Sequence, residues 1–380
     1  MEWKEITLGE IAIFKTGKLN SNAAISNGEY PFFTCSPETL RINNYAFDQE
    51  AILLAGNNAD GNFCIKYYKG KFNAYQRTYV ITPIRGKVDI KFLYYALSLC
   101  LKQFKNMSQG TSTKFLTVTI LNSFSVQLPS ISDQHRIASI LSSLDRKIEL
   151  NNKINADLEE MAQAIFKNWF VDFEPFKDGK FVDSELGMIP EGWKVGTLGD
   201  ITKNKSAKVK ERNDVKVLSP VTTGELVLSE EYFTKQVFSS SIAKYKIVNK
   251  GDFAYNPARV NIGSLGRNEF DFDGCVSPVY VVFSVLDGYE NYFDLFRKTD
   301  FFKDSVASLA IGGVRQSLSY DDLSSIEVII PSENAVEEFN NLYNQMKKTI
   351  KANKLENSRL SLLRDTLLPR LMSGELEVPE

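Results

Sequence analysis

The sequence predicts an α+β fold with two pseudo-two-fold-related α/β domains separated by an antiparallel coiled coil of two long helices. Two observations carry this prediction. The chain contains an internal repeat, with an offset of 190 residues at its start and 202 near its end. Each copy also closes on a long helical segment, and the first of these has apolar residues at heptad spacing. Because neither helix can bury its apolar stripe alone, we expect the two helices to pair.

Short matching segments define the repeat and show where the copies differ in length. The opening segment WKEITLGEI begins at Trp3 and returns as WKVGTLGDI at Trp193. The later matches are Gly110–Leu116 with Gly312–Leu318 and Phe124–Pro129 with Ile326–Pro331. The second copy therefore carries about twelve extra residues before these later segments. Alternating runs such as Phe72–Thr82 and Cys275–Ser284 predict strands in both copies.

The first long helix is predicted from Asp133 to Val171, after capping residues that include Ser130 and Ser132. At 1.5 Å per residue it would be about 60 Å long, and Pro175 prevents its continuation. The heptad seam comprises Ile137, Leu141, Leu144, Ile148, Asn151, Asn155, Leu158, Ala162, Ile165 and Trp169. A second, less regular helix is predicted over about 335–368.

Both helices carry asparagines near their middle, Asn151 and Asn155 in the first and Asn353 and Asn357 in the second. Two interpretations stay open. Asparagines in the seam would fix the register of the pair at a cost in stability, whereas asparagines on the outer faces would only meet solvent.

The composition is that of an ordinary globular protein, with 43% hydrophobic and 24% charged residues in 380. Apolar runs such as Phe92–Leu101 are too short to span a bilayer, and the N-terminal sequence does not resemble a signal peptide. We therefore expect a soluble, cytoplasmic protein. The four scattered cysteines predict buried thiols, and the single histidine, His135, is predicted on the surface, which nearly excludes a His-based metal cluster.

The distribution of charge indicates a basic face in the first copy. The whole chain has a net charge of −2, but residues 1–130 hold 14 Lys and Arg against 9 Asp and Glu, a net of +5. Residues 90–132 contain no acidic residue, and four lysines fall among them: Lys91, Lys102, Lys105 and Lys114. A local basic face on a nearly neutral protein is typical of DNA binding.

The sequence lacks the motifs of the enzymes that act on DNA. The run nearest to the Asx-Pro-Pro-aromatic motif of an adenine methyltransferase is Asn256-Pro257-Ala258-Arg259, which lacks the second proline and the aromatic. There is no phosphate-binding GxxxxGK[ST] loop. Glu269, Asp271 and Asp273 could imitate a nuclease metal site, but a solvated acidic turn explains them better. We expect no catalytic residues, no metal and no cofactor.

Over essentially its whole length, the chain resembles the specificity (S) subunit of type I restriction-modification enzymes. The resemblance rests on the order of its motifs: WKEITLGEIAIFKTGK from Trp3, GTSTKFLT from Gly110, SDQHRIASILSSLDRKIELNN from Ser132, GMIPEGWKVGTLGDI from Gly187 and LLRDTLLPRLMSGEL from Leu362. The segment PSENAVEEF from Pro331 departs from the pattern, because it lacks the Gln-x-x-Ile of its counterpart.

This resemblance implies a non-catalytic subunit that recognises a bipartite double-stranded DNA site. It implies as partners two modification (methyltransferase) subunits, which methylate adenine, and restriction (R) subunits, which cleave unmodified DNA. The expected organisation is target recognition domain 1 at 1–130, the first separator helix at 131–172, a linker at 173–192, target recognition domain 2 at 193–331, the second separator helix at 332–372 and a tail at 373–380.

Two loops in each domain combine the residue types that contact phosphates and base edges. Glycines in and beside these loops allow the backbone to approach a ligand closely. The candidate DNA-binding residues of the first domain are Asn57, Asn58, Tyr75, Gln76, Arg77, Ser112, Thr113 and Lys114. Those of the second domain are Asn256, Arg259, Asn261, Ser264, Arg315, Gln316 and Ser317. Ordinary surface turns are the alternative explanation for these loops.

Two other classes of function stay open on the residues alone. One is a freestanding DNA hydrolase, against which the missing catalytic motifs argue. The other is an interaction scaffold that uses the helical rod to join two proteins without DNA. The basic first copy and the loops rich in Asn, Gln and Arg favour DNA over the scaffold.

Overall fold

The computed structural model describes residues 2–233, 235–309 and 317–378. The chain divides into two compact units, unit 1 with residues 1–153 and 353–380 and unit 2 with residues 154–352. Each unit has its own hydrophobic core. The two long helices, α5 (Ile131–Phe170) and α11 (Glu333–Met372), each contribute one half to each unit.

Unit 1 is built on a six-stranded sheet of order β2-β8-β5-β7-β3-β4. All neighbours pair antiparallel except β3 and β7, which pair in parallel. The shorter strands β1 and β10 form a separate antiparallel pair. The elements are β1 (Lys4–Thr7), α1 (Leu8–Ile11), β2 (Ala12–Thr16), β3 (Tyr30–Phe33), β4 (Thr39–Ile42), β5 (Phe47–Ala55), β6 (Asn57–Asn58), β7 (Ile65–Ala74), β8 (Thr78–Pro83), α2 (Ile90–Leu99), α3 (Leu101–Met107), β9 (Lys114–Phe115), α4 (Val118–Ser123) and β10 (Ser125–Leu128).

The central strand β5 is buried on both faces, which explains its continuous apolar run. Ile52 and Leu54 join the main core of unit 1 with Phe92 of α2 and Ile137 of α5. The alternate residues of β5 point to the opposite face and join a second cluster with Phe33 and Phe72.

Unit 2 repeats this architecture with two four-stranded sheets, β14-β21-β18-β19 and β16-β15-β20-β17. The first corresponds to β2-β8-β5-β7, and β20 pairs in parallel with β15 as β7 does with β3. The elements are β11 (Phe181–Val182), β12 (Ile189–Pro190), β13 (Lys194–Thr197), α6 (Leu198–Ile201), β14 (Thr202–Lys205), β15 (Lys216–Pro220), β16 (Leu226–Leu228), α7 (Ser229–Tyr232), β17 (Lys246–Val248), β18 (Phe253–Tyr255), β19 (Leu265–Arg267), β20 (Gly274–Val276), β21 (Val281–Val285), α8 (Glu290–Phe296), α9 (Asp300–Leu309), α10 (Tyr320–Ser324) and β22 (Glu327–Ile330). Short 3-10 turns lie at Ser21–Ala23, Glu174–Phe176 and Val260–Ile262.

The repeat is visible in individual backbone hydrogen bonds. Leu8 N donates to Phe124 O at 2.8 Å in unit 1, and Leu198 N donates to Ile326 O at 2.8 Å in unit 2. Strand β1 pairs with β10 in the same register as β13 pairs with β22. The α+β class and the duplication predicted from the sequence are thus confirmed.

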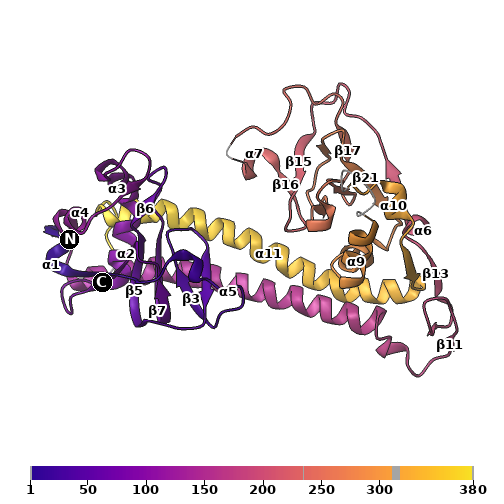
Figure 1. Cartoon of the computed structure of the whole chain (residues 1–380), viewed down its shortest axis with the longest axis horizontal. Coiled ribbons are helices and arrows are strands. Elements are labelled where there is room, and N and C mark those ends of the chain that lie inside the picture. The colour runs from indigo at the N-terminus through magenta and orange to yellow at the C-terminus, as the bar shows by residue number, and fades with distance from the viewer. Residues whose placement is uncertain (1, 234, 310–316, 379–380) are drawn as a thin grey trace. The chain divides into compact units, whose positions relative to one another are not determined.

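The two predicted long helices are also confirmed, with ends that differ from the prediction by one to four residues. Figure 1 shows α5 and α11 running side by side. In unit 1, Asp145 pairs with Arg364 at 2.8 Å and Asn151 hydrogen-bonds Asn357 at 2.9 Å, so residue numbers rise along α5 as they fall along α11. The helices are therefore antiparallel. Among the described residues, no helix has the length and hydropathy needed to cross a membrane.

Burial decides between the two interpretations for the asparagines of α5. Asn151 and Asn155 are 1% and 6% exposed, so both lie in the seam of α5 as its heptad spacing predicts. The Asn151 amide donates to Glu356 Oε2 at 2.7 Å as well as to Asn357 Oδ1. A buried polar group is tolerated only where it finds such partners.

One strand prediction needs correction. The runs Phe72–Thr82 and Cys275–Ser284 are not single strands, because each contains a tight turn. Thr78 N donates to Tyr75 O at 2.8 Å in the first, and Tyr280 N donates to Ser277 O at 3.0 Å in the second. Apolar residues alternate on both sides of each turn, so the sequence pattern alone does not reveal that the strand is interrupted.

Candidate nucleic-acid interface

In unit 1 the structure brings the two predicted loops together. Strand β6 pairs antiparallel with β9, so that Asn57 lies opposite Phe115 and Asn58 lies opposite Lys114. The backbone extends this contact, because Leu116 N donates to Gly56 O at 2.8 Å. Segments almost sixty residues apart in the sequence therefore form one surface.

The turn that carries Gln76 and Arg77 joins the same surface. Gly56 N donates to Arg77 O at 2.7 Å, which fixes this turn beside β6. Gln76 Nε2 donates to Asn20 Oδ1 at 2.7 Å, so its exposed side chain is already oriented. A Cβ at Gly56 would lie 2.4 Å from Arg77 O, which explains why only glycine fits here.

The loop after β6 is held by its own side chains. Asn58 Oδ1 accepts hydrogen bonds from the backbone N–H groups of Asp60 at 2.9 Å and Asn62 at 3.0 Å. Gly61 follows with a φ of 71°, a conformation that favours glycine. This arrangement stabilises the loop without a ligand, and a preformed loop loses less entropy on binding.

One residue of this surface was not among the candidate DNA-binding residues predicted from the sequence. Lys105 of α3 donates from Nζ to Asn62 Oδ1 at 2.9 Å, and its Cγ lies 3.0 Å from the position of a Cβ on Gly61. Lys114 Cγ lies 3.3 Å from the same point. The signal was present, since both lysines belong to the stretch without acidic residues.

The basic side chains of this surface are available to a ligand. Among the described residues, Arg77, Lys105 and Lys114 form no ion pair. Arg77 and Lys105 are exposed and Lys114 is half-buried. Of the other predicted residues, Gln76, Ser112 and Thr113 are exposed, and Asn57, Asn58 and Tyr75 are half-buried. Uncompensated positive charge beside amides and hydroxyls suits a phosphate backbone.

Unit 2 brings the corresponding segments together in the same way. Leu318 N donates to Pro257 O at 3.1 Å, which is the counterpart of the bond from Leu116 to Gly56. Asn256 Oδ1 accepts from Ala258 N at 3.1 Å, and this bond shapes the loop that presents Arg259. Arg259, Asn261 and Ser317 are exposed, and Asn256 is half-buried. Arg315 and Gln316 lie outside the described residues.

Ser264 does not belong to this surface. Its side chain is 1% exposed, and its hydroxyl donates to Pro220 O at 2.8 Å. The glycine on its N-terminal side directs the chain inward, so the polar side chain closes the loop against β15. Its predicted contact with DNA is therefore wrong for this arrangement of the loop.

The acidic turn of unit 2 is not simply solvated, because its carboxylates pair with basic side chains. Glu269 pairs with Lys347 at 2.6 Å, and Asp273 pairs with Arg212 at 3.0 Å. Asp271 accepts hydrogen bonds from Lys250 and Lys351, which lower the pKa of its carboxyl. No group of three potential metal ligands occurs among the described residues. The turn instead ties the sheet of unit 2 to α11.

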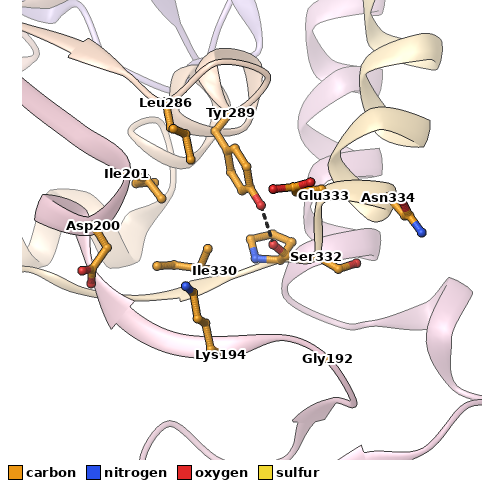
Figure 2. Close-up of a pocket in the computed structure, with 11 residues that line it drawn as sticks. Gly192, Lys194, Asp200, Ile201, Leu286, Tyr289, Ile330, Ser332, Glu333 and Asn334 are labelled. Carbon is orange, nitrogen blue, oxygen red and sulfur yellow. Dashed lines mark hydrogen bonds between the residues drawn. The ribbon is translucent and has the colours of Figure 1, made fainter.

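A surface pocket of about 450 Å³ lies where β13 and β22 meet the start of α11. Figure 2 shows Tyr289 and Leu286 above Ile330, with Lys194 on the opposite side. The polar groups here serve the fold: the Tyr289 hydroxyl donates to Pro331 O at 2.8 Å, and the Asp200 carboxylate accepts from Thr197 N at 2.7 Å. These hydrogen bonds stabilise the region where β13 and β22 meet the start of α11.

The structure also tests the predictions for the histidine and the cysteines. His135 is exposed, with Nε2 at 3.5 Å from Asp89 Oδ2, as expected of a surface histidine. Cys275 is buried, whereas Cys35, Cys64 and Cys100 are only partly buried. Burial raises the pKa of the Cys100 and Cys275 thiols to about 11, which keeps them protonated at neutral pH.

Two equivalent α/β units combined with a pair of long antiparallel helices are the architecture of a specificity subunit. Residues 1–160 match the family described as the type I restriction modification DNA specificity domain. Together with a relative that is 30% identical and covered to 78% of its length, this match shows that the chain belongs to the type I restriction enzyme specificity subunits.

Individual relatives cover most of the chain. It is 30% identical to the EcoDI specificity subunit of Escherichia coli over 372 residues, covering 87% of this chain and 78% of that protein. It is 29% identical to the MjaIX specificity subunit of Methanocaldococcus jannaschii, covering 79% and 72%. The crystal structure of the S subunit from M. genitalium shares the fold, with a TM-score of 0.63 at 18% identity and coverage of 97% and 96%.

Proposed function

We propose that this chain reads a bipartite double-stranded DNA site and directs the modification and restriction subunits of a type I complex to it. Each unit supplies one reading surface, built from loops within residues 1–130 or 193–331. The observation that carries the proposal is the convergence of two separate loops in each unit. Convergent polar and basic loops are what base and phosphate contacts require.

The proposed partners follow from family membership. Two modification subunits would bind the chain and methylate adenine, and restriction subunits would join to cleave unmodified DNA. The chain itself would hold no cofactor and perform no chemistry, and the complex would act in the cytoplasm. The two half-sites should lie about one helical turn apart, on the order of 10 bp from centre to centre, with the long helices setting that distance.

Methyl transfer tests the proposal. The purified chain with S-adenosylmethionine and a library of duplexes should transfer no methyl groups. With the modification subunit of its own system, the complex should methylate adenine in a bipartite motif. Turnover by the chain alone would favour a freestanding enzyme. Modification of the same motif without the chain would favour a scaffold that does not read DNA.

A further inference from the structure

The turns that precede β8 and β21 are structural equivalents with different chemistry. Both are four-residue turns closed by the hydrogen bonds Thr78 N to Tyr75 O and Tyr280 N to Ser277 O. The central residues are Gln76 and Arg77 in unit 1, and the corresponding residues in unit 2 are Pro278 and Val279. None of the candidate DNA-binding residues predicted from the sequence lies in the second turn.

Strand register places each turn at the end of the strand pair from which the first interface loop of its unit begins. In unit 1, Leu54 pairs with Tyr79, and in unit 2, Tyr255 pairs with Val281. This last pair ends the pairing of β18 with β21, so Val279 and Pro257 each lie two residues beyond it. The carbonyl of Pro257 accepts the bond from Leu318 that joins the two loops. Val279 thus lies just beyond the strand pair from which the loops of unit 2 begin, as Arg77 does in unit 1.

The side chain of Val279 is unusually open for its type. It is 72% exposed, the highest value among the exposed large apolar side chains of the described residues. Turns of this kind favour Gly, Asn, Asp or Ser at their centre, and a β-branched residue brings no benefit to the turn itself. Pro278 has a fixed φ, which stiffens the turn that carries the valine.

We propose that Val279 contacts the 5-methyl group of a thymine in the half-site read by unit 2. In the major groove, the thymine methyl is the feature that apolar side chains recognise, whereas arginine recognises guanine. The rigid turn gives a methyl-to-methyl contact at small entropic cost, and the exposed Arg259 and Asn261 nearby supply the polar contacts. This inference rests on the proposed DNA-reading function.

Deoxyuridine, which lacks only the 5-methyl group, provides the probe. The full chain assembled with its modification subunit binds duplexes in which each thymine of the half-site is replaced in turn. The wild-type complex should lose affinity about fourfold at one thymine, the effect of one buried methyl group. Val279→Ala should bind thymine and deoxyuridine equally at that position. Val279→Thr keeps a methyl group and should retain the preference.

Val182→Ala is the matched control, because Val182 is an exposed valine in the β11–β12 hairpin of the same unit. It should behave as wild type. A half-site without thymine, a wild-type complex indifferent to every deoxyuridine, or Val279→Ala with an unchanged preference would each overturn the inference. A Val279→Ala defect confined to subunit assembly would assign the residue to a protein contact instead. Failure of the wild-type complex to select any DNA sequence would contradict the proposed function itself.

Discussion

Lys105 and Lys114 both lie beside Gly61. Their aliphatic stems lie against Gly61, and among the described residues neither forms an ion pair. We therefore expect both to contact phosphates rather than bases. The same role is predicted from the sequence for Arg315 of the second copy.

Replacing Lys114 by Ala should weaken DNA binding equally on all sequences. Because one fewer counterion is released, the slope of log K against log salt concentration should fall by about 0.9 in magnitude. The slope is obtained from affinities measured between 50 and 200 mM salt. Over this range the Debye length falls from about 14 Å to about 7 Å. Lys69→Ala is the control, since Lys69 is an exposed lysine in the middle of β7. Relaxed recognition at a single base pair would instead show that Lys114 reads a base.

A buried ion pair in unit 2 makes a prediction about stability. The side chains of Asp294 and Arg297 are 8% and 9% exposed and lie 2.6 Å apart. Burial alone would raise the pKa of Asp294, but Arg297, Lys298 and Lys347 outweigh it and lower the pKa to about 2. Arg297 also donates to Leu265 O and Gly224 O, so the pair joins α8 to β19.

Asp294→Asn should destabilise unit 2 by about 3 to 5 kcal/mol, because Arg297 stays buried without its countercharge. Since the pKa of Asp294 is lower in the folded state than its ordinary value of 3.8, the stabilisation is complete above about pH 4 and is lost as the pH falls toward 2. Urea unfolding between pH 2 and 7 measures both effects. Asp300→Asn, which breaks the exposed pair with Lys303, should change stability by no more than about 1 kcal/mol. Equal effects of the two variants would contradict this account.

At the scale of elements, the long helices were the most predictable part of the fold. Heptad spacing over 40 residues is a strong signal, and it placed Ile137 and Asn151 correctly in the seam. It missed Phe166 and Phe170, which are 1% and 5% exposed. These two rings pack against Tyr292 and Trp193 as well as α11, so this end of α5 is buried on more than one side.

The sheets and the interface were only partly predictable. Strand order depends on contacts distant in sequence, such as the parallel pair β3–β7, which periodicity does not encode. The two loops of each unit could be named from residue type, but their contact through β6 and β9 could not. Ser264 was misassigned because its polarity suited a surface, whereas its hydroxyl closes an internal bond.

The polar layer around Asn151 should stabilise the helix pair in unit 1. Asn151→Ala leaves Glu356 and Asn357 without their buried donor, at a cost of about 1 to 3 kcal/mol. Amide hydrogen exchange in peptides from residues 353–372 should therefore accelerate. Lys153→Ala, an exposed change on the same helix, should leave exchange as in wild type. Unchanged protection in Asn151→Ala would show that the apolar seam alone holds the helices.

At the scale of the whole molecule, duplication gives each unit a complete and separate interface. The corresponding bonds Leu116 to Gly56 and Leu318 to Pro257 show that the same arrangement is built twice from different residues. Asn57 and Asn58 in one unit are replaced by Ala258 and Arg259 in the other. We therefore expect the two units to read different half-sites, and a change in one surface to alter only one of them.

Sequencing of DNA methylated by the assembled complex tests this central claim most directly. The account predicts a motif of two different half-sites separated by unspecified base pairs. It also predicts that Gln76→Ala, a change on the surface of unit 1 only, relaxes one half-site and leaves the other half-site and the spacer unchanged. A single continuous motif, or a Gln76→Ala variant that alters both halves, would contradict it.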